Sequence, residues 1–490
     1  MTDTDPFRPE ARAPRGFVDR RARDLAAERR IVEAVSAVYE SYGFEALDSG
    51  AFEYADALGK FLPDADRPNE GVFALQDDDE QWMALRYDLT APLARFCAQN
   101  WETLPKPFRR YAVGTVWRNE KPGPGRFRAF VQCDADTVGS ARPEADAEII
   151  AMASAGLTAA GLPPGQAVIK INNRKLLNGL LTAAGVESQG QKLAVLRAVD
   201  KLDRLGPEGV RLLLGEGRKD ESGAFTKGAG LQGKAIDAVL AFTQAGAGRA
   251  DVLSRLAAVI GGSAEGDEGL DDLSRIDTAL TGLGVSADQA LFDPSIVRGL
   301  EYYTGAVFEA DLLLSTLDDK GQPVRFGSIG GGGRYDDLVA RFTGERTPAT
   351  GFSFGVSRLA AALRAAGRDQ AVEARGPVVV IAFDQSGMAE YFAVAAELRA
   401  AGIAAEVYLG SSGMKAQMKY ADRRLSPAAV MLGGDEIAAG TVTIKDLDLG
   451  RELSRQVTDN SQWREGRPGQ QTIPRGEMVQ AIRAILGSGQ

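Results

Sequence analysis

The feature that most restricts the fold is a pair of strand-like segments joined by a turn rich in proline and glycine. The segments are Arg110–Trp117 and Arg126–Gln132, and the sequence Lys-Pro-Gly-Pro-Gly lies between them at 121–125. Two strands separated by so short a turn favour an antiparallel hairpin. Because residues two apart in a strand share one face, some polar side chains of the hairpin should lie together. The side chains predicted to share a surface are Arg118, Arg128, Phe130 and Gln132.

The chain is acidic overall but carries one basic cluster. Its 490 residues include 57 Lys and Arg against 67 Asp and Glu, a net charge of −10. This balance argues against unspecific coating of nucleic acid, which needs clustered cations. The basic residues of the cluster are Lys106, Arg109, Arg110, Arg118, Lys121, Arg126 and Arg128. Two interpretations remain open, a dedicated site for an anionic ligand or a solvated charged face.

The residue types that the sequence lacks restrict its chemistry. It contains no histidine, which excludes histidine general bases, Ser-His-Asp triads and histidine metal ligands. Its two cysteines, Cys97 and Cys133, supply neither a disulfide framework nor a four-ligand zinc site. The N-terminus is acidic, and no apolar run approaches the ~18 residues that a membrane span needs. We therefore expect a cytoplasmic protein with no membrane partner.

Changes in hydrophobic period divide the chain into four segments. Residues 1–185 mix helical and strand-like patterns, and strand-like patterns return over 266–365. Between them, residues 186–265 are mostly helical in pattern and are interpreted as an inserted subdomain. Strands and helices alternate over 376–490, which is typical of a separate small α/β domain.

Some local predictions inside these segments matter later. The pattern predicts one helix at Leu193–Leu205, a Gly- and charge-rich stretch at Gly215–Gly233 that interrupts the helical segment, and a strand at Ala290–Val297. The glycines at 330–333 precede a predicted helix, and a simple turn is an open interpretation for them.

Three stretches resemble the signature motifs of class II aminoacyl-tRNA synthetases. Arg118-x-Glu120, followed by a loop and Gly125–Gln132, resembles motif 2. Gly351–Leu359 resembles motif 3. The helix ending at Gly43-Phe44-Glu45, followed by Phe52-Glu53, resembles motif 1, although Ser49-Gly50 stands where a proline is usual. Their order and spacing make the combination specific.

Further stretches resemble the histidyl subfamily. They are Leu85–Thr90, Arg298–Gly305 and Gly332–Asp336 in the first 365 residues, and 414–421 and 438–442 in the last domain. The resemblance covers the chain from about Pro14 onward, including the inserted segment. It implies an α/β (α+β) catalytic core in which an antiparallel sheet is flanked by helices. Residues 1–185 and 266–365 would form this core, 186–265 a helical insertion, and 376–490 an anticodon-binding domain.

The same resemblance implies the activity, ATP-dependent ligation of L-histidine to the 3′ end of tRNA through a histidyl-adenylate. It implies ATP and Mg²⁺ as the nucleotide and its metal, tRNA as a partner, and a homodimer, with no metal held by the protein itself. Two alternatives stay open: a non-catalytic paralogue that regulates histidine biosynthesis, and a related class II synthetase for another amino acid. The paralogue is disfavoured because such proteins lack the C-terminal domain and lose catalytic residues.

The resemblance also implies roles for individual residues. In the ATP site, Arg118 and Arg298 would hold the α-phosphate, Glu120 the adenine side, and Arg126 the outer phosphates, with adenine between Phe130 and Arg358. In the histidine site, Thr90, Gln132 and Asp136 would hold the α-amino group, Asp88 and Tyr303 the imidazole, and Tyr302 and Tyr335 would line the pocket. Without the resemblance, Tyr302 and Tyr303 also fit strand-core aromatics, and the two aspartates fit solvated carboxylates.

Overall fold

In the computed structural model the chain divides into two units, Met1–Asp369 and Gln370–Gln490. The structure describes residues 9–58, 71–122, 127–219, 223, 225–260, 262–297, 302–314, 316–317, 323–324, 327–368, 375–456 and 469–487. Within these residues, every helix is too short or too polar to cross a bilayer.

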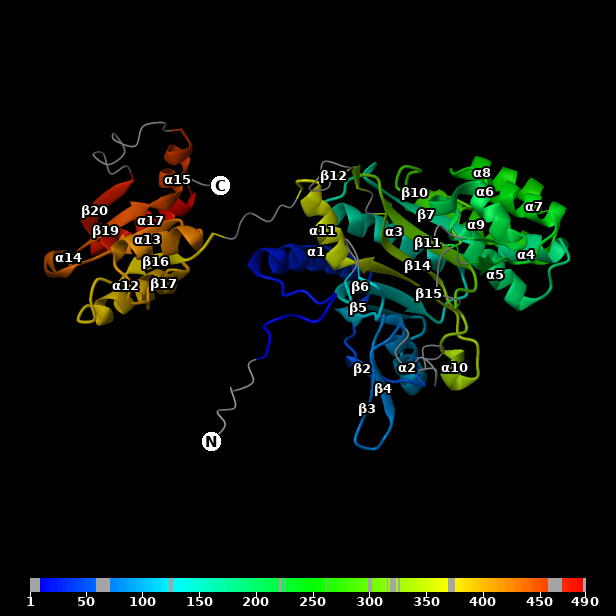
Figure 1. Ribbon diagram of the computed structural model, residues 1–490, viewed down its shortest axis with the longest axis horizontal. Helices are drawn as coiled ribbons and strands as arrows, with labels where there is room; N and C mark the ends of the chain where they lie inside the picture. The colour runs from blue at the N-terminus through cyan, green and yellow to red at the C-terminus, as the bar shows by residue number, and fades with distance from the viewer. Residues whose placement is uncertain are drawn as a thin grey trace. The chain divides into compact units, whose positions relative to one another are not determined.

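An eight-stranded, mostly antiparallel sheet forms the centre of the first unit (Figure 1). Its strands, in spatial order, are β1 Glu45–Ala46, β5 Phe108–Trp117, β6 Ala129–Val138, β15 Ala349–Gly355, β14 Ser328–Arg334, β11 Ala306–Leu312, β7 Ala167–Asn173 and β10 Ala290–Phe292. Only the outermost pairs, β1 with β5 and β10 with β7, are parallel. This confirms the predicted fold class, an antiparallel sheet with helices around it.

The hairpin predicted from the sequence is the pair β5 and β6. The two strands pair antiparallel from Phe108↔Val138 to Trp117↔Ala129. The predicted bounds of the second strand were wrong, because β6 begins at Ala129 and continues well past Gln132. The missed half contains Asp134 and Asp136, polar residues that end an apolar pattern in the sequence although both are buried in the structure.

Three helices pack against this sheet, α1 Ala22–Ser41, α3 Pro143–Ala159 and α11 Val356–Ala365, and α1 also packs against the other two. From α1, Val35 and Tyr39 are fully buried, and the Tyr39 hydroxyl donates to the Cys133 carbonyl of β6. From α3, Ile149 and Ile150 are also fully buried. The apolar core formed in this way fixes the position of β6 and β15.

The glycine-rich segment is a central strand, not a turn. Gly330–Gly333 belong to β14, which pairs with β11 on one side and β15 on the other. A Cβ on Gly332 would lie 2.0 Å from the Gly351 carbonyl oxygen, and one on Gly330 would lie 2.8 Å from the Phe352 ring. Glycine is therefore required here by close packing of neighbouring strands.

A helical group lies beside the β7–β10 end of the sheet (Figure 1). Its members are α4 Arg174–Ala183, α5 Gln189–Val199, α6 Leu202–Leu214, α7 Gly233–Thr243, α8 Ala250–Ile260 and α9 Ala264–Gly282. The single helix predicted at Leu193–Leu205 is wrong, because α5 ends at Val199 and α6 is kinked at Gly206, where φ is 65°. The glycine-rich interruption contains a small hairpin, β8 Gly217–Lys219 with β9 Phe225–Lys227.

Two other boundaries also differ from the predictions. The strand predicted at Ala290–Val297 ends at Phe292, after which Asp293 accepts hydrogen bonds from Ser295 and turns the chain. The helix α9 begins at Ala264 and so crosses the predicted end of the inserted segment, residue 265.

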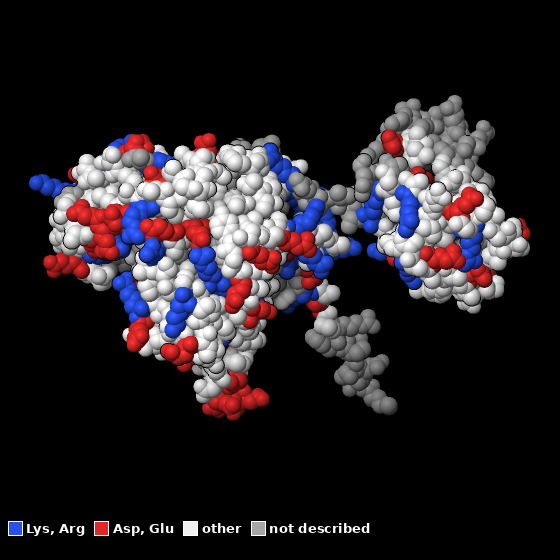
Figure 2. Space-filling model, turned by 180° about the vertical axis from the view of Figure 1, so that it is seen from behind, with Lys and Arg blue, Asp and Glu red and all other residues white. Residues whose placement is uncertain are grey.

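The remaining elements of the first unit lie outside the eight-stranded sheet. They are the three-stranded sheet β2 Phe52–Tyr54, β4 Trp82–Leu85 and β3 Ala74–Gln76, the helices α2 Thr90–Asn100 and α10 Ala340–Thr343, and the pair β12 Thr316–Leu317 and β13 Pro323–Val324. Four acidic residues, Asp77–Glu80, form the turn between β3 and β4 and show as an acidic tip on the surface (Figure 2).

The second unit is a five-stranded mixed sheet covered by helices. In spatial order its strands are β17 Ala405–Val407, β16 Val378–Ile381, β18 Ala428–Met431, β19 Thr441–Asp446 and β20 Gln470–Pro474. Its helices are α12 Met388–Ala400, α13 Met414–Arg423, α14 Gly434–Ala439, α15 Leu447–Gln456 and α17 Met478–Gly487, preceded by the 3₁₀ turn η1 Arg475–Glu477. The strand–helix alternation predicted from Val378 onward is present, while α14, α15 and β20 were missed.

Candidate active site

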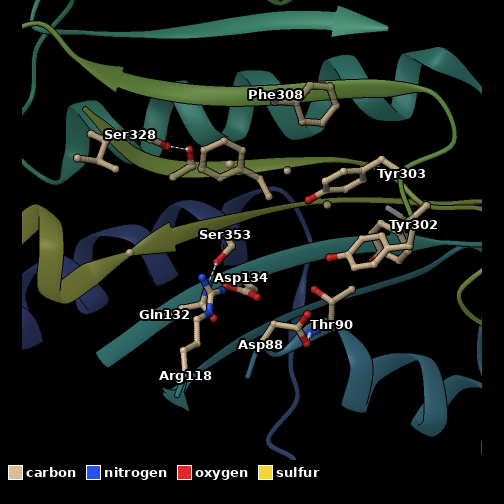
Figure 3. A pocket seen from close by; sticks show the side chains of 18 of the residues that line it. Asp88, Thr90, Arg118, Gln132, Asp134, Tyr302, Tyr303, Phe308, Ser328 and Ser353 are labelled. Atoms are coloured by element: carbon tan, nitrogen blue, oxygen red, sulfur yellow. Dashed lines mark hydrogen bonds between the residues drawn. The ribbon is translucent and has the colours of Figure 1, made fainter. Parts of the chain in front are cut away.

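A cavity of about 670 Å³ lies over the middle strands of the first unit's sheet (Figure 3). Every predicted site residue that the structure describes lines it: Asp88, Thr90, Arg118, Glu120, Phe130, Gln132, Asp136, Tyr302, Tyr303, Tyr335 and Arg358. The two remaining predicted residues, Arg126 and Arg298, lie outside the described residues. Segments far apart in the sequence therefore meet in one pocket.

Asp88 lies at the start of α2, where backbone N–H groups have no partner within the helix. Its Oδ1 atom accepts hydrogen bonds from the backbone N–H groups of Thr90 (3.1 Å) and Ala91 (2.9 Å). Its Oδ2 atom is buried without a donor. Burial raises the pKa of Asp88, and the two backbone donors and Arg118 oppose that rise. The carboxylate therefore offers one unused acceptor inside the pocket.

Alternate residues of β6 point into the pocket, as the two-residue period of a strand requires. The Gln132 Nε2 donates to Ser353 Oγ on β15 at 2.6 Å, and its Oε1 atom has no donor. Asp136 faces Arg110, whose Nη2 lies 2.9 Å from Asp136 Oδ2, and it also accepts a hydrogen bond from the Tyr335 hydroxyl. Burial raises the pKa of Asp136, while Arg110 and Tyr335 oppose it.

Three tyrosines form the wall beside these carboxylates. The Tyr302 ring meets Tyr303 edge-on at 4.9 Å between centroids and Tyr335 at 5.9 Å. The Arg174 guanidinium lies 5.9 Å from the Tyr303 ring centroid, and its Nη1 donates to the Tyr303 carbonyl at 3.2 Å. Burial is the largest cause of the raised pKa of Tyr303, so its hydroxyl stays protonated and can donate.

The other end of the pocket carries arginines and an aromatic ring. The Arg118 guanidinium lies 5.1 Å from the Phe130 ring centroid, and its Nε donates to the Tyr87 carbonyl at 3.1 Å. Arg358, in the first turn of α11, donates to the Ser328 carbonyl at 2.9 Å. Guanidinium forks suit phosphate oxygens, and an aromatic ring beside them suits a nucleobase.

The described residues of the basic cluster at 106–128 do not form one anion-binding site. Arg110 is fully buried against Asp136, while Arg109 pairs with Glu148 at 3.0 Å. Arg128 was predicted to share a face with Phe130 but packs over Phe73 instead, 5.9 Å from its ring centroid. Figure 2 shows basic and acidic residues interspersed on the visible face of the first unit.

Several residues that line the pocket were not predicted from the sequence. Asp134 and Ser353 line the pocket, as do Arg174 and residues of α5. Asp134 was detectable in principle, because it lies between Gln132 and Asp136 at the two-residue spacing of a strand. Ser353 and α5 depend on strand register and helix placement, which left no local signal. Among the described residues, no three or more Asp, Glu or Cys are arranged to hold a metal ion.

Comparisons with known proteins agree with this arrangement. A family model described as "Histidyl-tRNA synthetase" matches residues 16–359, and one described as "Anticodon binding domain" matches residues 377–485. A curated "Histidine–tRNA ligase" from Caulobacter vibrioides is 80% identical over 483 residues, 98% of each chain. One from Brucella suis is 56% identical, over 97% of this chain and 96% of the relative. The crystal structure of histidyl-tRNA synthetase from Nostoc sp. PCC 7120 is 27% identical with a TM-score of 0.71, covering 97% of this chain and all of that one. Both units of the chain are matched.

Proposed function

The chain belongs to the histidyl-tRNA synthetase family, and we propose from this membership that its large pocket is where ATP activates L-histidine for transfer to tRNA. The protein is a class II histidine–tRNA ligase, which charges tRNA with histidine at the expense of ATP. A regulatory paralogue is not favoured, because the match to the ligases includes the anticodon-binding domain. The main support for this site is a single cavity. One end of it is lined by arginines and an aromatic ring, and the other end by carboxylates and tyrosines.

The chemistry in this pocket needs no protein nucleophile. The histidine carboxylate attacks the α-phosphorus of ATP, which gives histidyl-adenylate and pyrophosphate. The terminal ribose hydroxyl of tRNA then attacks the activated carbonyl and releases AMP. Arg118 and Arg298 would stabilise the charge that develops on the α-phosphate, so catalysis rests on positioning and charge neutralisation.

The unpaired oxygen atoms of the pocket are assigned to the amino end of histidine. An ammonium group has three donors and no acceptor, so it binds best to acceptors without donors of their own. Asp88 Oδ2 and Gln132 Oε1 are such acceptors, and Thr90 lines the same cavity. These contacts support Asp88, Thr90 and Gln132 as ammonium ligands. This exchanges the roles of Asp88 and Asp136 relative to those implied by the sequence resemblance.

The imidazole is assigned to Asp136 and the tyrosines. Asp136 lies against Tyr335, which contacts Tyr302, so its carboxylate sits beside an aromatic wall that suits a planar ring. Imidazole has one N–H donor and one bare acceptor nitrogen. A carboxylate and the Tyr303 hydroxyl read both groups, and an amino acid lacking them leaves buried polar atoms unpaired, which gives strong rejection.

ATP is assigned to the opposite end, with adenine between Phe130 and Arg358, Glu120 at the adenine side and Arg126 toward the outer phosphates. Mg²⁺ would arrive with the nucleotide and be held chiefly by phosphate oxygens, because the described protein residues form no three-ligand set. When bound, the ion neutralises charge on the pyrophosphate portion. The cytoplasm, where translation takes place, is the proposed compartment.

We also propose a homodimer, for which the small sheet β2-β4-β3 supplies an interface. By its register, Phe52, Tyr54, Leu75, Met83 and Leu85 share one face. Phe52 is 44% exposed and Tyr54 56%, an apolar face that a monomer leaves in water. Phe52→Asp should shift sedimentation toward the monomer, whereas Phe225→Asp, at a 61%-exposed phenylalanine of β9, should not.

Exchange of labelled pyrophosphate into ATP tests the function directly. Histidine alone in a panel of amino acids should support exchange, and Arg118→Ala should reduce it by about 100-fold or more. Exchange supported equally by other amino acids would contradict the proposed pocket.

Imidazole propionate, histidine without its amino group, tests the two aspartates. Asp88→Asn should weaken the binding of histidine but not that of imidazole propionate, and Asp136→Asn should weaken the binding of both. The reverse pattern would restore the roles that the resemblance implied.

A further inference from the structure

A third carboxylate in the pocket has no assigned role. Asp134 lies on β6 between Gln132 and Asp136, on the same face of the strand, and lines the cavity (Figure 3). It is only 2% exposed, and its Oδ1 atom has no hydrogen-bond donor. A buried carboxylate is costly unless something requires it.

Asp134 is connected to Gln132 through one serine. Ser353 on β15 is the direct cross-strand partner of Asp134. Its Oγ accepts from Gln132 Nε2 at 2.6 Å, which leaves the hydroxyl hydrogen to point to the Asp134 carboxylate across the strand pair, where Ser353 lowers the pKa of Asp134. A serine hydroxyl carries a single hydrogen, and an ionised carboxylate only accepts. When Asp134 is ionised, the chain therefore runs in one direction, from the glutamine amide N–H through the hydroxyl to the carboxylate.

This direction decides which end of the glutamine amide enters the pocket. With Nε2 bound to Ser353, the Oε1 atom of Gln132 is left without a donor, and it is buried. If the amide turned over, two N–H donors would face the pocket in its place, and they would repel an ammonium group. An amide beside a hydroxyl alone has no such preference, because a hydroxyl can donate or accept.

We propose that Asp134 is a positioning residue that acts through Ser353 to hold the Gln132 carbonyl toward the α-ammonium group of histidine. The proposal rests on the assignment of Gln132 to the amino end of the substrate made above. It adds a requirement for the negative charge of a residue that does not itself contact the reacting atoms.

The charges around Asp134 give the proposal a pH signature. Burial, with Asp136 next, raises the pKa of Asp134 to about 8; Arg110 and Ser353 oppose the rise, and Asp88 adds to it. An incoming ammonium group favours the ionised form. The fixed direction of the chain is therefore complete above pH 8 and is weakened below it, where the carboxyl carries a proton of its own.

Two competitive inhibitors of histidine-dependent pyrophosphate exchange test the proposal in the full-length enzyme. Histidinol keeps the amino group and the ring but lacks the carboxylate, and imidazole propionate keeps the ring and the carboxylate but lacks the amino group. Asp134→Asn and Ser353→Ala should each raise the inhibition constant of histidinol about 10-fold or more at pH 9. Neither should change that of imidazole propionate or the KM for ATP. Ser154→Ala, at a buried serine of α3 outside the pocket, is the matched control.

Two further readouts separate positioning from a structural role. The double variant should be no worse than either single variant, because both break one chain. The ratio of the histidinol constants, Asp134→Asn over wild type, should grow as the pH rises from 6.5 to 9, and this ratio cancels the ligand's own titration. Ser353→Ala keeps the test available if Asp134→Asn does not fold.

Equal losses for both inhibitors, additive losses in the double variant, or unchanged histidinol binding would overturn the proposal. Gln132→Ala distinguishes this failure from failure of the proposed site. If Gln132→Ala weakens histidinol but Asp134→Asn does not, only the positioning role is wrong. If Gln132→Ala is also without effect, the assignment of the amino group itself is wrong.

Discussion

Two ion pairs on α3, one buried and one exposed, allow the effect of burial on the stability contribution of an ion pair to be measured. Arg334 on β14 reaches Asp146 of α3 through Nε (3.0 Å) and Nη2 (2.6 Å), and both side chains are under 10% exposed. Its Nη1 and Nη2 also donate to the carbonyls of Ser140 and Arg142. Replacing Arg334 with methionine leaves a buried carboxylate without its cation. This should lower the free energy of unfolding by about 3–5 kcal/mol.

The expected change in melting temperature follows from the size of the first unit. An unfolding entropy of about 2.1 cal/mol/K per residue, over roughly 370 residues, gives about 0.8 kcal/mol/K. Arg334→Met should therefore lower the main calorimetric transition by about 4–6 °C. The control is Arg275→Met, which removes a pair with Glu144, also on α3, at 2.8 Å; the two side chains are 42% and 43% exposed. An exposed pair contributes about 0–1 kcal/mol, so this variant should shift the transition by about 1 °C or less.

The pH dependence gives a second check on the same variant. Burial raises the pKa of Asp146, and Arg334 is the strongest opposing influence, so removal of Arg334 should raise that pKa further. A carboxyl group whose pKa is higher in the folded than in the unfolded state costs stability as the pH rises between the two values. The loss in Arg334→Met should therefore be larger at pH 8 than at pH 5. Equal losses from Arg334→Met and Arg275→Met, or a larger loss at pH 5, would refute the reasoning.

Three other variants test the pocket. Arg298→Ala should fold but lose pyrophosphate exchange by about 100-fold or more, and near-normal exchange would reject its assignment to the α-phosphate. Phe130→Ala should raise the KM for ATP by about 10-fold through lost stacking and leave the KM for histidine unchanged; equal changes in both constants would argue against an adenine site. Asp134→Asn should be at least as stable as wild type, with an advantage that grows from pH 5 to 8, because it removes a buried group whose pKa is raised to about 8. A lower melting temperature at pH 8 would show that Asp134 supports the fold.

The antiparallel core was predictable from the sequence because its clearest part is local. The strand β5 and the start of β6 lie within one stretch of chain, and the proline- and glycine-rich sequence between them predicts an antiparallel pair. The continuation of β6 was not predictable from the pattern of apolar residues, because Asp134 and Asp136 are polar residues that are buried in the lining of the pocket. The strand β14 was missed for the opposite reason: glycines that suit a turn are required there because neighbouring strands leave no room for a Cβ.

The sequence predicted which residues lie in the pocket but not which contacts they make with one another. The motifs, more than 200 residues apart, were placed together by their resemblance to one family. The contacts that give those residues their chemistry depend on register instead. Gln132 meets Ser353 across 221 positions of sequence, because β6 and β15 pair antiparallel. Arg110 was assigned to a basic cluster by sequence proximity, yet the strand turns its side chain inward to Asp136.

The three buried carboxylates of the pocket cost folding free energy, and their role in the proposed binding of histidine explains why this cost is tolerated. Asp88, Asp134 and Asp136 are all nearly fully buried there, and burial is the largest cause of the raised pKa of each. Arg110 is the cation in direct contact, and it is used by Asp136. Asp88 Oδ2, Gln132 Oε1 and Asp134 Oδ1 are buried in the pocket without a donor, and a buried acceptor without a donor lowers the stability of the fold. In the proposed assignment, the ammonium group of histidine would bring three donors and complete this hydrogen bonding. These acceptors would then favour a cationic amino group over an uncharged analogue, which would link the cost in stability to recognition of the substrate.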